Sequence, residues 1–277
     1  MNKPRKATHR TGQGIRVGIG GWTYAPWRNN FYPDRLVQRR ELEYASRQLR
    51  AIEINGTFYR AQKPATYARW AAETPAGFVF SLKAPRYITQ STRLADASKG
   101  VRGFIQGGLA ELGDRLGPIL WQLPPSRPFD ADDLAAFLDA LPQQLNGQPL
   151  RHAMEVRDAT FLDQRYVTLA RSHGVATVFT DSPDFPALAD LTGDFVYVRL
   201  KHSVDGIPTG YSSAALDQWA RQSRDWAAGK DAAALPHAGA AQTRSDPRDV
   251  FVFFIGAAKQ RNPAAALALQ QRIDASG

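Results

Sequence analysis

The feature that most constrains the fold is a regular alternation between short β-rich segments and helical patterns along the 277 residues. Several of the β-rich segments, such as FVFSLK, FVYVRL and VFVFFI, are almost continuously apolar or β-forming, which is typical of strands covered on both faces. We count eight such segments. The predicted strands are Ile15–Gly20, Ala51–Asn55, Phe78–Lys83, Ile119–Leu123, His152–Val156, Ala176–Thr180, Phe195–Leu200 and Val250–Ile255.

Helical patterns fill seven of the connections, and the sixth connection, Asp181–Gly193, is shorter and has a weaker pattern. Pro64 and Pro263 suit the first turn of a helix, and Gly174 suits a stop before the sixth strand. Eight strand-then-helix units favour a closed parallel barrel, because eight strands enclose an interior that side chains fill. We therefore predict a single (β/α)8 TIM-type barrel with a short or irregular sixth helix. The seven predicted helices are Arg39–Arg50, Ala65–Glu73, Val101–Leu112, Ala131–Leu141, Gln164–His173, Ser213–Ala228 and Pro263–Ile273.

The chain has no visible linker or second compositional block, so we assign residues 15–277 to one barrel domain. Residues 1–14 are a basic leader, which we expect to be disordered, and residues 229–249 lack any sustained period and are predicted to form a mobile loop. No apolar run is long enough to cross a membrane, and no apolar stretch follows the basic start, so we expect a cytoplasmic protein. The absence of cysteine excludes disulfides, thiolate catalysis and cysteine-ligated zinc.

A formal net charge of +9 points to anionic partners, but its distribution is uneven. The acid-free leader supplies four of these charges, from Lys3, Arg5, Lys6 and Arg10, which leaves +5 for the remainder. Nucleic acid is one candidate partner, and a solvated basic surface is the alternative.

Polar residues are dense where the predicted strands end, which is the functional face of such a barrel. Glu53 lies between two isoleucines, and Glu155 lies between Met154 and Val156, so strand alternation turns both carboxylates away from their apolar neighbours. Carboxylates that converge near cations can take separate acid and base roles. We take Glu53, Glu155 and Asp181 as candidate catalytic groups. The alternative is a structural salt-bridge network that joins the two glutamates to Lys83, Arg157 or Arg199.

The candidate substrate-binding side chains come from the same strand ends. Lys83 is interpreted as an anion-binding or structural cation rather than a Schiff-base nucleophile, because nearby glutamates would raise its pKa. Trp22 and Tyr24 are the aromatic residues best placed to stack on a ligand, although core packing is an alternative for this aromatic cluster. The candidate set is Trp22, Tyr24, Asn55, Tyr59, Lys83, Gln122, Arg157, Arg199 and His202.

No phosphate-cradling loop, dinucleotide fingerprint or serine nucleophile elbow follows any predicted strand, so no nucleotide cofactor is expected. A tightly bound metal is not expected either, because the five histidines show no metal-binding spacing. The alternative metal site would combine His202 with Glu155 and Asp181.

An ordered series of motifs resembles the family called domain of unknown function 72, or YecE-like. The match runs from about Arg16 to Arg272, through IRVGIGGWTYAPWRNNFYP, AIEINGTFYR, FVFSLKAPRYIT, LGPILWQLPPS, MEVRDATF, TDSP and DFVYVRL followed by GYSS. The resemblance implies a TIM-type barrel with a polar mouth and no agreed activity, and it adds Tyr211 to the substrate-binding candidates. Two departures from the family pattern concern the last two strands. Ile255 and Gly256 stand where an acidic and an amide residue are usual, and Lys201 or His202 takes the place of a histidine.

Three functions are compatible with these residues. The leading hypothesis is an enzyme, such as a hydrolase or lyase, in which Glu53 and Glu155 exchange protons with a small polar, phosphorylated or sugar-like substrate. The second is nucleic-acid binding or metal-assisted phosphodiester chemistry. The third is a non-catalytic ligand-binding protein, which the absence of the acid at Ile255 favours.

Overall fold

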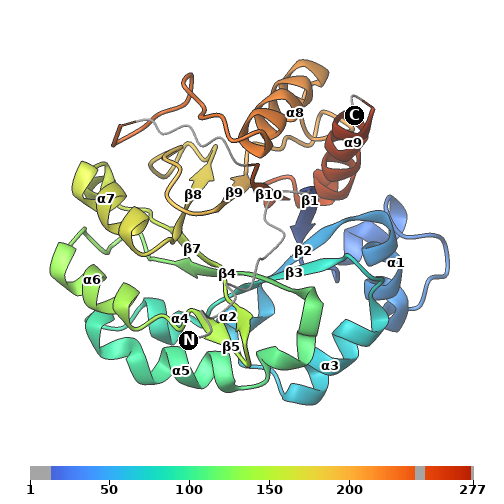
Figure 1. Ribbon diagram of the computed structural model, residues 1–277. Helices are drawn as coiled ribbons and strands as arrows, with labels where there is room; N and C mark the ends of the chain where they lie inside the picture. The colour runs from blue at the N-terminus through green and yellow to red at the C-terminus, as the bar shows by residue number, and fades with distance from the viewer. Residues whose placement is uncertain (1–13, 241–246, 276–277) are drawn as a thin grey trace, which may run out of the picture.

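Eight parallel strands close into a barrel in the computed structural model, which describes residues 14–240 and 247–275 (Figure 1). Around the barrel the strands follow the order β1, β10, β9, β8, β7, β4, β3, β2, so each strand pairs with its neighbours in sequence. The predicted fold class is confirmed. The strands are β1 (Ile15–Gly20), β2 (Ala51–Ile54), β3 (Val79–Lys83), β4 (Leu116–Gln122), β7 (His152–Glu155), β8 (Ala176–Thr180), β9 (Phe195–Leu200) and β10 (Asp249–Phe254).

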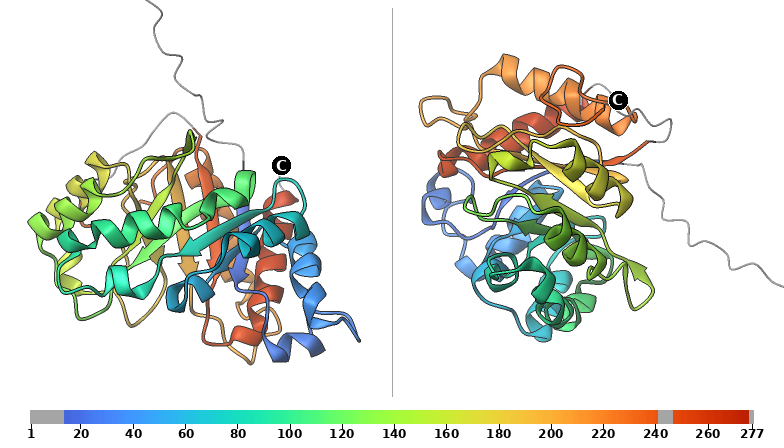
Figure 2. Two further views of the ribbon diagram at one scale, coloured as in Figure 1. Left: turned by 90° about the horizontal axis from the view of Figure 1, so that it is seen from below. Right: turned by 90° about the vertical axis from the view of Figure 1, so that its left-hand side faces the viewer.

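The helices form a layer outside the strands (Figures 1 and 2). The predicted helix over residues 101–112 is wrong in its extent, because Gly108 has a φ of 121° and ends α5 before a 3-10 helix, η4, begins. Between β8 and β9 the structure describes every residue and contains no helix, as expected for the sixth connection. The longer helices are α1 (Glu41–Gln48), α3 (Pro64–Glu73), α5 (Ser98–Gln106), α6 (Ala131–Asp139), α7 (Gln164–Ser172), α8 (Ser213–Ala227) and α9 (Asn262–Asp274).

Short helical turns lie mainly in the connections that follow the strands. They are α2 (Gly56–Tyr59), α4 (Arg86–Thr89), η1 (Ala25–Asn29), η2 (Gln38–Arg40), η3 (Leu94–Ala97), η4 (Leu109–Arg115), η5 (Ala159–Phe161) and η6 (Lys259–Arg261). A small antiparallel hairpin, β5 (Gln144–Leu145) with β6 (Gln148–Pro149), precedes β7 and was not predicted. Its turn is Asn146-Gly147, and both residues have positive φ, which is the backbone that an Asn-Gly hairpin turn requires.

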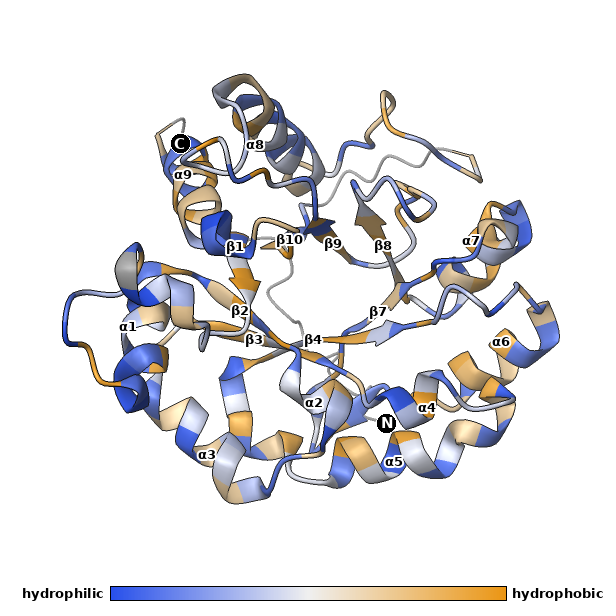
Figure 3. Ribbon diagram, turned by 180° about the vertical axis from the view of Figure 1, so that it is seen from behind, coloured by the Kyte–Doolittle hydropathy of each residue, from blue (hydrophilic) through white to orange (hydrophobic). Residues whose placement is uncertain are grey.

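The core has two parts, and strand alternation separates them. On β9, Val196, Val198 and Leu200 belong to the large cluster that includes the helices, whereas Phe195 and Tyr197 belong to a second cluster inside the barrel. Figure 3 shows hydrophobic and hydrophilic residues alternating along the outer helices, as expected for helices that pack one face on a sheet. The inner cluster comprises Ala51, Val79, Leu120, Ala153, Ala176, Val178, Phe195, Tyr197, Phe251 and Phe253.

Ion pairs close the amino end of the barrel. Asp249, which is 5% exposed, accepts Arg16 Nη1 at 3.0 Å and pairs with Arg151 Nη1 at 2.7 Å. With this end closed and the middle filled by apolar side chains, the polar residues at the carboxyl end line a shallow mouth rather than a pore.

The connection between α8 and β10 is described as far as residue 240 and is held in place there. Asp190 accepts hydrogen bonds from the backbone amides of Ala238 and Gly239, each at 2.9 Å, and Ala189 donates to the Pro236 carbonyl at 2.8 Å. Mobility of residues 229–249 stays a prediction, as does the single-domain assignment. The predicted leader lies outside the described residues except for Gly14. No helix in the described part of the chain is long and apolar enough to span a membrane.

Candidate functional site

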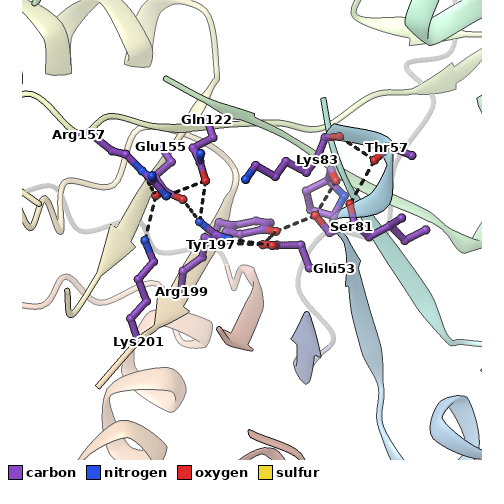
Figure 4. A network of polar contacts seen from close by, with 12 residues as sticks. Glu53, Thr57, Ser81, Lys83, Gln122, Glu155, Arg157, Tyr197, Arg199 and Lys201 are labelled. Atoms are coloured by element: carbon purple, nitrogen blue, oxygen red, sulfur yellow. Dashed lines mark hydrogen bonds and ion pairs between the residues drawn. The ribbon is translucent and has the colours of Figure 1, made fainter. Parts of the chain in front are cut away.

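The two predicted carboxylates converge at the barrel mouth on one arginine (Figure 4). Glu53 is the penultimate residue of β2 and Glu155 is the last residue of β7, and both are fully buried. Arg199 of β9 binds Glu53 through two hydrogen bonds, from Nε at 3.0 Å and from Nη2 at 2.9 Å, and its Nη1 binds Glu155. Strand alternation therefore predicted their inward direction correctly. The geometry is that of the alternative hypothesis, a network of buried ion pairs.

Each glutamate also accepts hydrogen bonds from other side chains. Tyr197 donates to Glu53 Oε2 at 2.8 Å, and its hydroxyl also lies 2.7 Å from Ser81 Oγ. Glu155 Oε1 accepts Arg157 Nε at 2.8 Å and Lys201 Nζ at 3.1 Å.

The charge state of Glu155 follows from these neighbours. Burial alone would raise the pKa of Glu155, but Arg199, Lys201 and Arg157 together hold it well below its usual value. A general acid needs a raised pKa, so this environment favours a permanently charged, positioning role for Glu155.

Gln122 at the end of β4 links the two arginines. Its Oε1 accepts Arg157 Nη2 at 2.7 Å and Arg199 Nη1 at 3.2 Å, which leaves its amide nitrogen as a donor toward the mouth. The ring of Phe185, from the irregular β8–β9 connection, covers the outer side of this cluster. Its centroid lies 4.3 Å from the Arg157 guanidinium carbon and 5.0 Å from Lys201 Nζ. Phe185 was not predicted, because it belongs to a segment without a repeating pattern.

Lys83 is the exception among the charged residues of the mouth. It is 8% exposed, and its amine lies 3.9 Å from the centroid of the Phe58 ring. Among the described residues, no carboxylate or other acceptor is paired with this amine (Figure 4). Burial lowers the pKa of Lys83 to about 8, and the charge of Arg199 adds to this effect, while Glu53 and Glu155 oppose it. The glutamates do raise the pKa of Lys83, as expected, but burial and the charge of Arg199 outweigh them, so the expected net increase is wrong.

Asp181 lies to one side of the network. Its carboxylate accepts the Lys201 backbone amide and, at 3.0 Å, the hydroxyl of Tyr211, which in turn accepts the His202 amide at 2.7 Å. Burial raises the pKa of Asp181. Tyr211 is buried and helps to hold the backbone after β9 through these hydrogen bonds, whereas His202 is exposed. Asp181 is thus connected to Glu155 through Lys201, a residue that the candidate set omitted.

The aromatic residues after β1 and β2 border a pocket of about 540 Å³ at the ends of β1, β2 and β10. Trp22, Asn55 and Tyr59 line it, and their role in binding a ligand stays a prediction. Trp22 packs edge-on against Trp70 at 5.2 Å between ring centroids. Tyr24 is placed differently. Lys259 Nζ lies 4.6 Å from the centroid of its ring, and Tyr24 does not line this pocket.

A second pocket, of about 480 Å³, lies beside the end of β9 and shares Ile255 and Gly256 with the first. Lys201, His202 and Phe185 line it. Ile255 packs against the inner core cluster, and a Cβ atom at position 256 would lie 1.8 Å from Ser203 Oγ. The departure from the family pattern is therefore matched by its surroundings, because any side chain at position 256 would require Ser203 to move.

Histidine, aspartate and glutamate are the metal-binding residue types to consider, since the sequence has no cysteine. In the part of the chain that the structure describes, no set of three or more such residues is arranged to hold a metal ion. His152 is structural: its Nδ1 lies 3.1 Å from Trp121 Nε1, and burial lowers its pKa to about 4. The alternative set of Glu155, Asp181 and His202 is not brought together, since Glu155 and Asp181 are each occupied by other partners.

Comparisons with known proteins agree with this architecture. The family model described as "Protein of unknown function DUF72" matches residues 16–277. A Bacillus subtilis protein named UPF0759 protein YunF is 25% identical over 116 residues, so the match spans 40% of this chain and 40% of that curated relative. A DUF72 family protein of Thermotoga maritima superposes with a TM-score of 0.71 and 20% identity, covering 96% of this chain and 100% of its own. A DUF72 family protein of Enterococcus faecalis superposes with a TM-score of 0.70 and 14% identity, covering 94% of this chain and 96% of its own. At such identities the solved structures show the fold alone.

Proposed function

Because the chain belongs to the DUF72 family, whose description assigns no activity, we propose a function from the barrel mouth itself. The protein is an enzyme that carries out acid–base chemistry on a small, polar, anionic substrate bound beside Lys83. The observation that supports this proposal is the amine of Lys83, a residue that is 8% exposed at the functional face of the barrel. This amine is paired with no acceptor among the described residues, while both glutamates are bound by Arg199.

The balance of charge favours an anion. Four cationic side chains, Lys83, Arg157, Arg199 and Lys201, face two carboxylates, so the cluster carries an excess of two positive charges when all groups are ionised. An unpaired buried charge is costly, and a bound anion would offset that cost. A carboxylate or phosphate group would supply the missing acceptors for Lys83 Nζ and for the free amide nitrogen of Gln122.

Lys83 is the group best suited to exchange a proton. A pKa of about 8 lies near neutrality, where a side chain serves efficiently as both acid and base. Glu53 and Glu155 position Arg199, Arg157 and Lys201 around the ligand. Lys83 does not line the pocket bordered by Trp22 and Tyr59, and we propose that this pocket receives the part of the substrate that does not react. We retain the prediction of a cytoplasmic location.

Ligand-induced thermal stabilisation tests this proposal. Phosphate, glucose 6-phosphate and malate should raise the melting temperature, by roughly 5 to 10 °C at a hundredfold excess over Kd, whereas glucose should not. Lys83→Met should abolish the effect, and Lys99→Met, which changes an exposed lysine, should preserve it. Equal stabilisation of wild type and Lys83→Met by the anions would place their site elsewhere.

A non-catalytic ligand-binding protein is a second candidate, favoured by the apolar Ile255 where relatives carry an acid. The two candidates differ in what happens to the ligand. After prolonged incubation with the protein, a ligand that stabilises it is recovered chemically unchanged if the protein only binds, and converted to product if it is an enzyme.

A further inference from the structure

The position of Lys83 is fixed by the strand that carries it. Along β3, Val79 and Ser81 face the barrel interior, since Val79 belongs to the inner cluster and Ser81 Oγ lies 2.7 Å from the inward hydroxyl of Tyr197. Alternation then directs Lys83 into the mouth, one layer above Ser81. Thr57 donates to the Lys83 carbonyl at 2.7 Å and ties the strand end to α2, the turn that carries Phe58.

The surroundings of the amine are unlike those of a lysine in an ion pair. An aromatic ring lies on one side of Nζ, and the nearby charges of Arg199 and Arg157 repel the ammonium form. The two carboxylates that would favour that form, Glu53 and Glu155, are held by arginines. Burial and the two arginine charges favour the neutral amine, and they outweigh the Phe58 ring and the two glutamates, which favour the ammonium ion.

The consequence for reactivity is large. With a pKa of about 8, about a quarter of Lys83 is the free amine at pH 7.5, against about one part in a thousand for an ordinary lysine. A neutral amine carries the lone pair that attacks carbonyl carbon, and burial beside other cations is a known way to activate a lysine nucleophile.

The other cations of the mouth favour a carbonyl compound that also carries a negatively charged group. Arg157 and Lys201 each use part of their hydrogen-bonding capacity on Glu155, and their side chains are 18% and 13% exposed, so both retain donors toward the mouth. A carboxylate or phosphate on the substrate would bind these donors and hold the carbonyl carbon near Nζ.

Resting on the anion-binding function proposed above, we infer that Lys83 forms a Schiff base with a small aldehyde or ketone that carries an anionic group, such as a 2-oxo acid. The lone pair of Nζ forms the N–C bond while the carbonyl π bond breaks. The resulting carbinolamine takes up one proton and loses its hydroxyl group as water. The product is a protonated C=N bond, which withdraws electrons from the adjacent carbon, and hydrolysis regenerates the lysine and the carbonyl. No oxidant or reductant is needed.

Reductive trapping tests the inference. The full-length protein is incubated with glyoxylate, pyruvate or glyceraldehyde 3-phosphate in the presence of cyanoborohydride, which reduces the C=N bond to a stable secondary amine. Peptide mapping by mass spectrometry then locates the label. We expect at least one probe to label Lys83 more than tenfold faster than exposed Lys99, with a rate that levels off above a pH of about 8.

Lys83→Arg separates this inference from the function on which it rests. The variant keeps a cation but no primary amine at this position, so lactate and phosphate should still stabilise it against heat while labelling at position 83 disappears. If Lys83 of the wild type is labelled no faster than Lys99 with every probe while the anions still stabilise the protein, the Schiff base is wrong and the anion site stands. If neither labelling nor stabilisation occurs, both proposals fail.

Discussion

At the scale of single residues, Lys83 lowers the stability of the ligand-free protein, and its removal should reveal this. The pKa of Lys83 falls from 10.5 to about 8 on folding, which corresponds to about 3 kcal/mol at ~1.4 kcal/mol per pKa unit. Lys83→Met removes this cost and keeps most of the packing on Phe58. We therefore expect the variant to be more stable than wild type at pH 7, by about 1 to 3 kcal/mol in urea unfolding.

The pH dependence of that difference provides the check. Because the folded pKa lies below the unfolded one, the unfolded chain binds more protons between about pH 8 and pH 10.5, so wild-type stability gains from Lys83 as the pH rises through this window. The advantage of Lys83→Met should thus shrink toward pH 10.5. Lys201 and Lys259 also have lowered pKa values, so the difference between the two proteins is the quantity to compare. A constant difference from pH 7 to pH 10.5 would contradict the assignment.

Substitution of Glu53 should lower the stability of the protein, in contrast to Lys83→Met. It is fully buried and accepts two hydrogen bonds from Arg199 and one from Tyr197, so Glu53→Gln removes one of the two carboxylates that neutralise a buried guanidinium. Breaking a buried ion pair from one side costs about 3 to 5 kcal/mol, which urea unfolding would resolve. The matched control is Glu43→Gln, in an exposed pair with Arg40, where we expect no measurable change. Equal effects of the two substitutions would show that the network contributes little.

The sequence was informative about which residues face the mouth and uninformative about how they pair. A strand repeats every two residues, so the neighbours of Glu53 and Glu155 were enough to predict their direction. Pairing depends on the reach of Arg199 across the barrel, and no spacing in the sequence encodes that distance. For the same reason the sequence did not indicate that Lys83 lacks an ion-pair partner among the described residues: Arg199 pairs with both glutamates.

At the scale of elements, the abrupt ends of the apolar runs made β1, β8 and β9 predictable to the residue. The start of β4 was predicted three residues late, because Gly117 and Pro118 usually interrupt strands. Here the glycine is required: a Cβ atom at position 117 would lie 2.2 Å from Val79 Cγ1 on the neighbouring strand. Such close approaches between strands depend on tertiary structure, and local sequence patterns therefore do not predict them.

The α8–β10 connection provides a prediction at this scale. Asp190 is 2% exposed and binds two backbone amides of the connection, so Asp190→Ala would leave both half-buried donors without this partner. At about 1 to 3 kcal/mol for a lost partner, the connection should open locally well before the barrel unfolds. Limited proteolysis should then cut between residues 229 and 240 much faster than in wild type or in the exposed control Asp96→Ala. An unchanged cleavage rate would show that other contacts hold the segment.

At the scale of the whole molecule, the net charge of +9 raises the question of whether nucleic acid binds to the barrel or to the leader. The mouth places its cations around a small, partly enclosed site, which suits one or two anionic groups rather than a long phosphate backbone. The leader concentrates Lys3, Arg5, Lys6 and Arg10 within a few residues. We therefore expect the binding of single-stranded oligonucleotides to depend mainly on the leader.

Salt dependence distinguishes the two locations. Each neutralised phosphate of a single strand contributes about 0.7 to the slope of log K against log salt, so deleting residues 2–13, with their four cations, should reduce the slope by about 3. Fluorescence anisotropy at several salt concentrations measures it. The same deletion should leave thermal stabilisation by phosphate and malate intact, because Lys83, Arg157 and Lys201 all lie in the barrel. If the steep slope persists after the deletion, the barrel itself binds the phosphate backbone, and phosphodiester chemistry becomes the stronger hypothesis for the site beside Lys83.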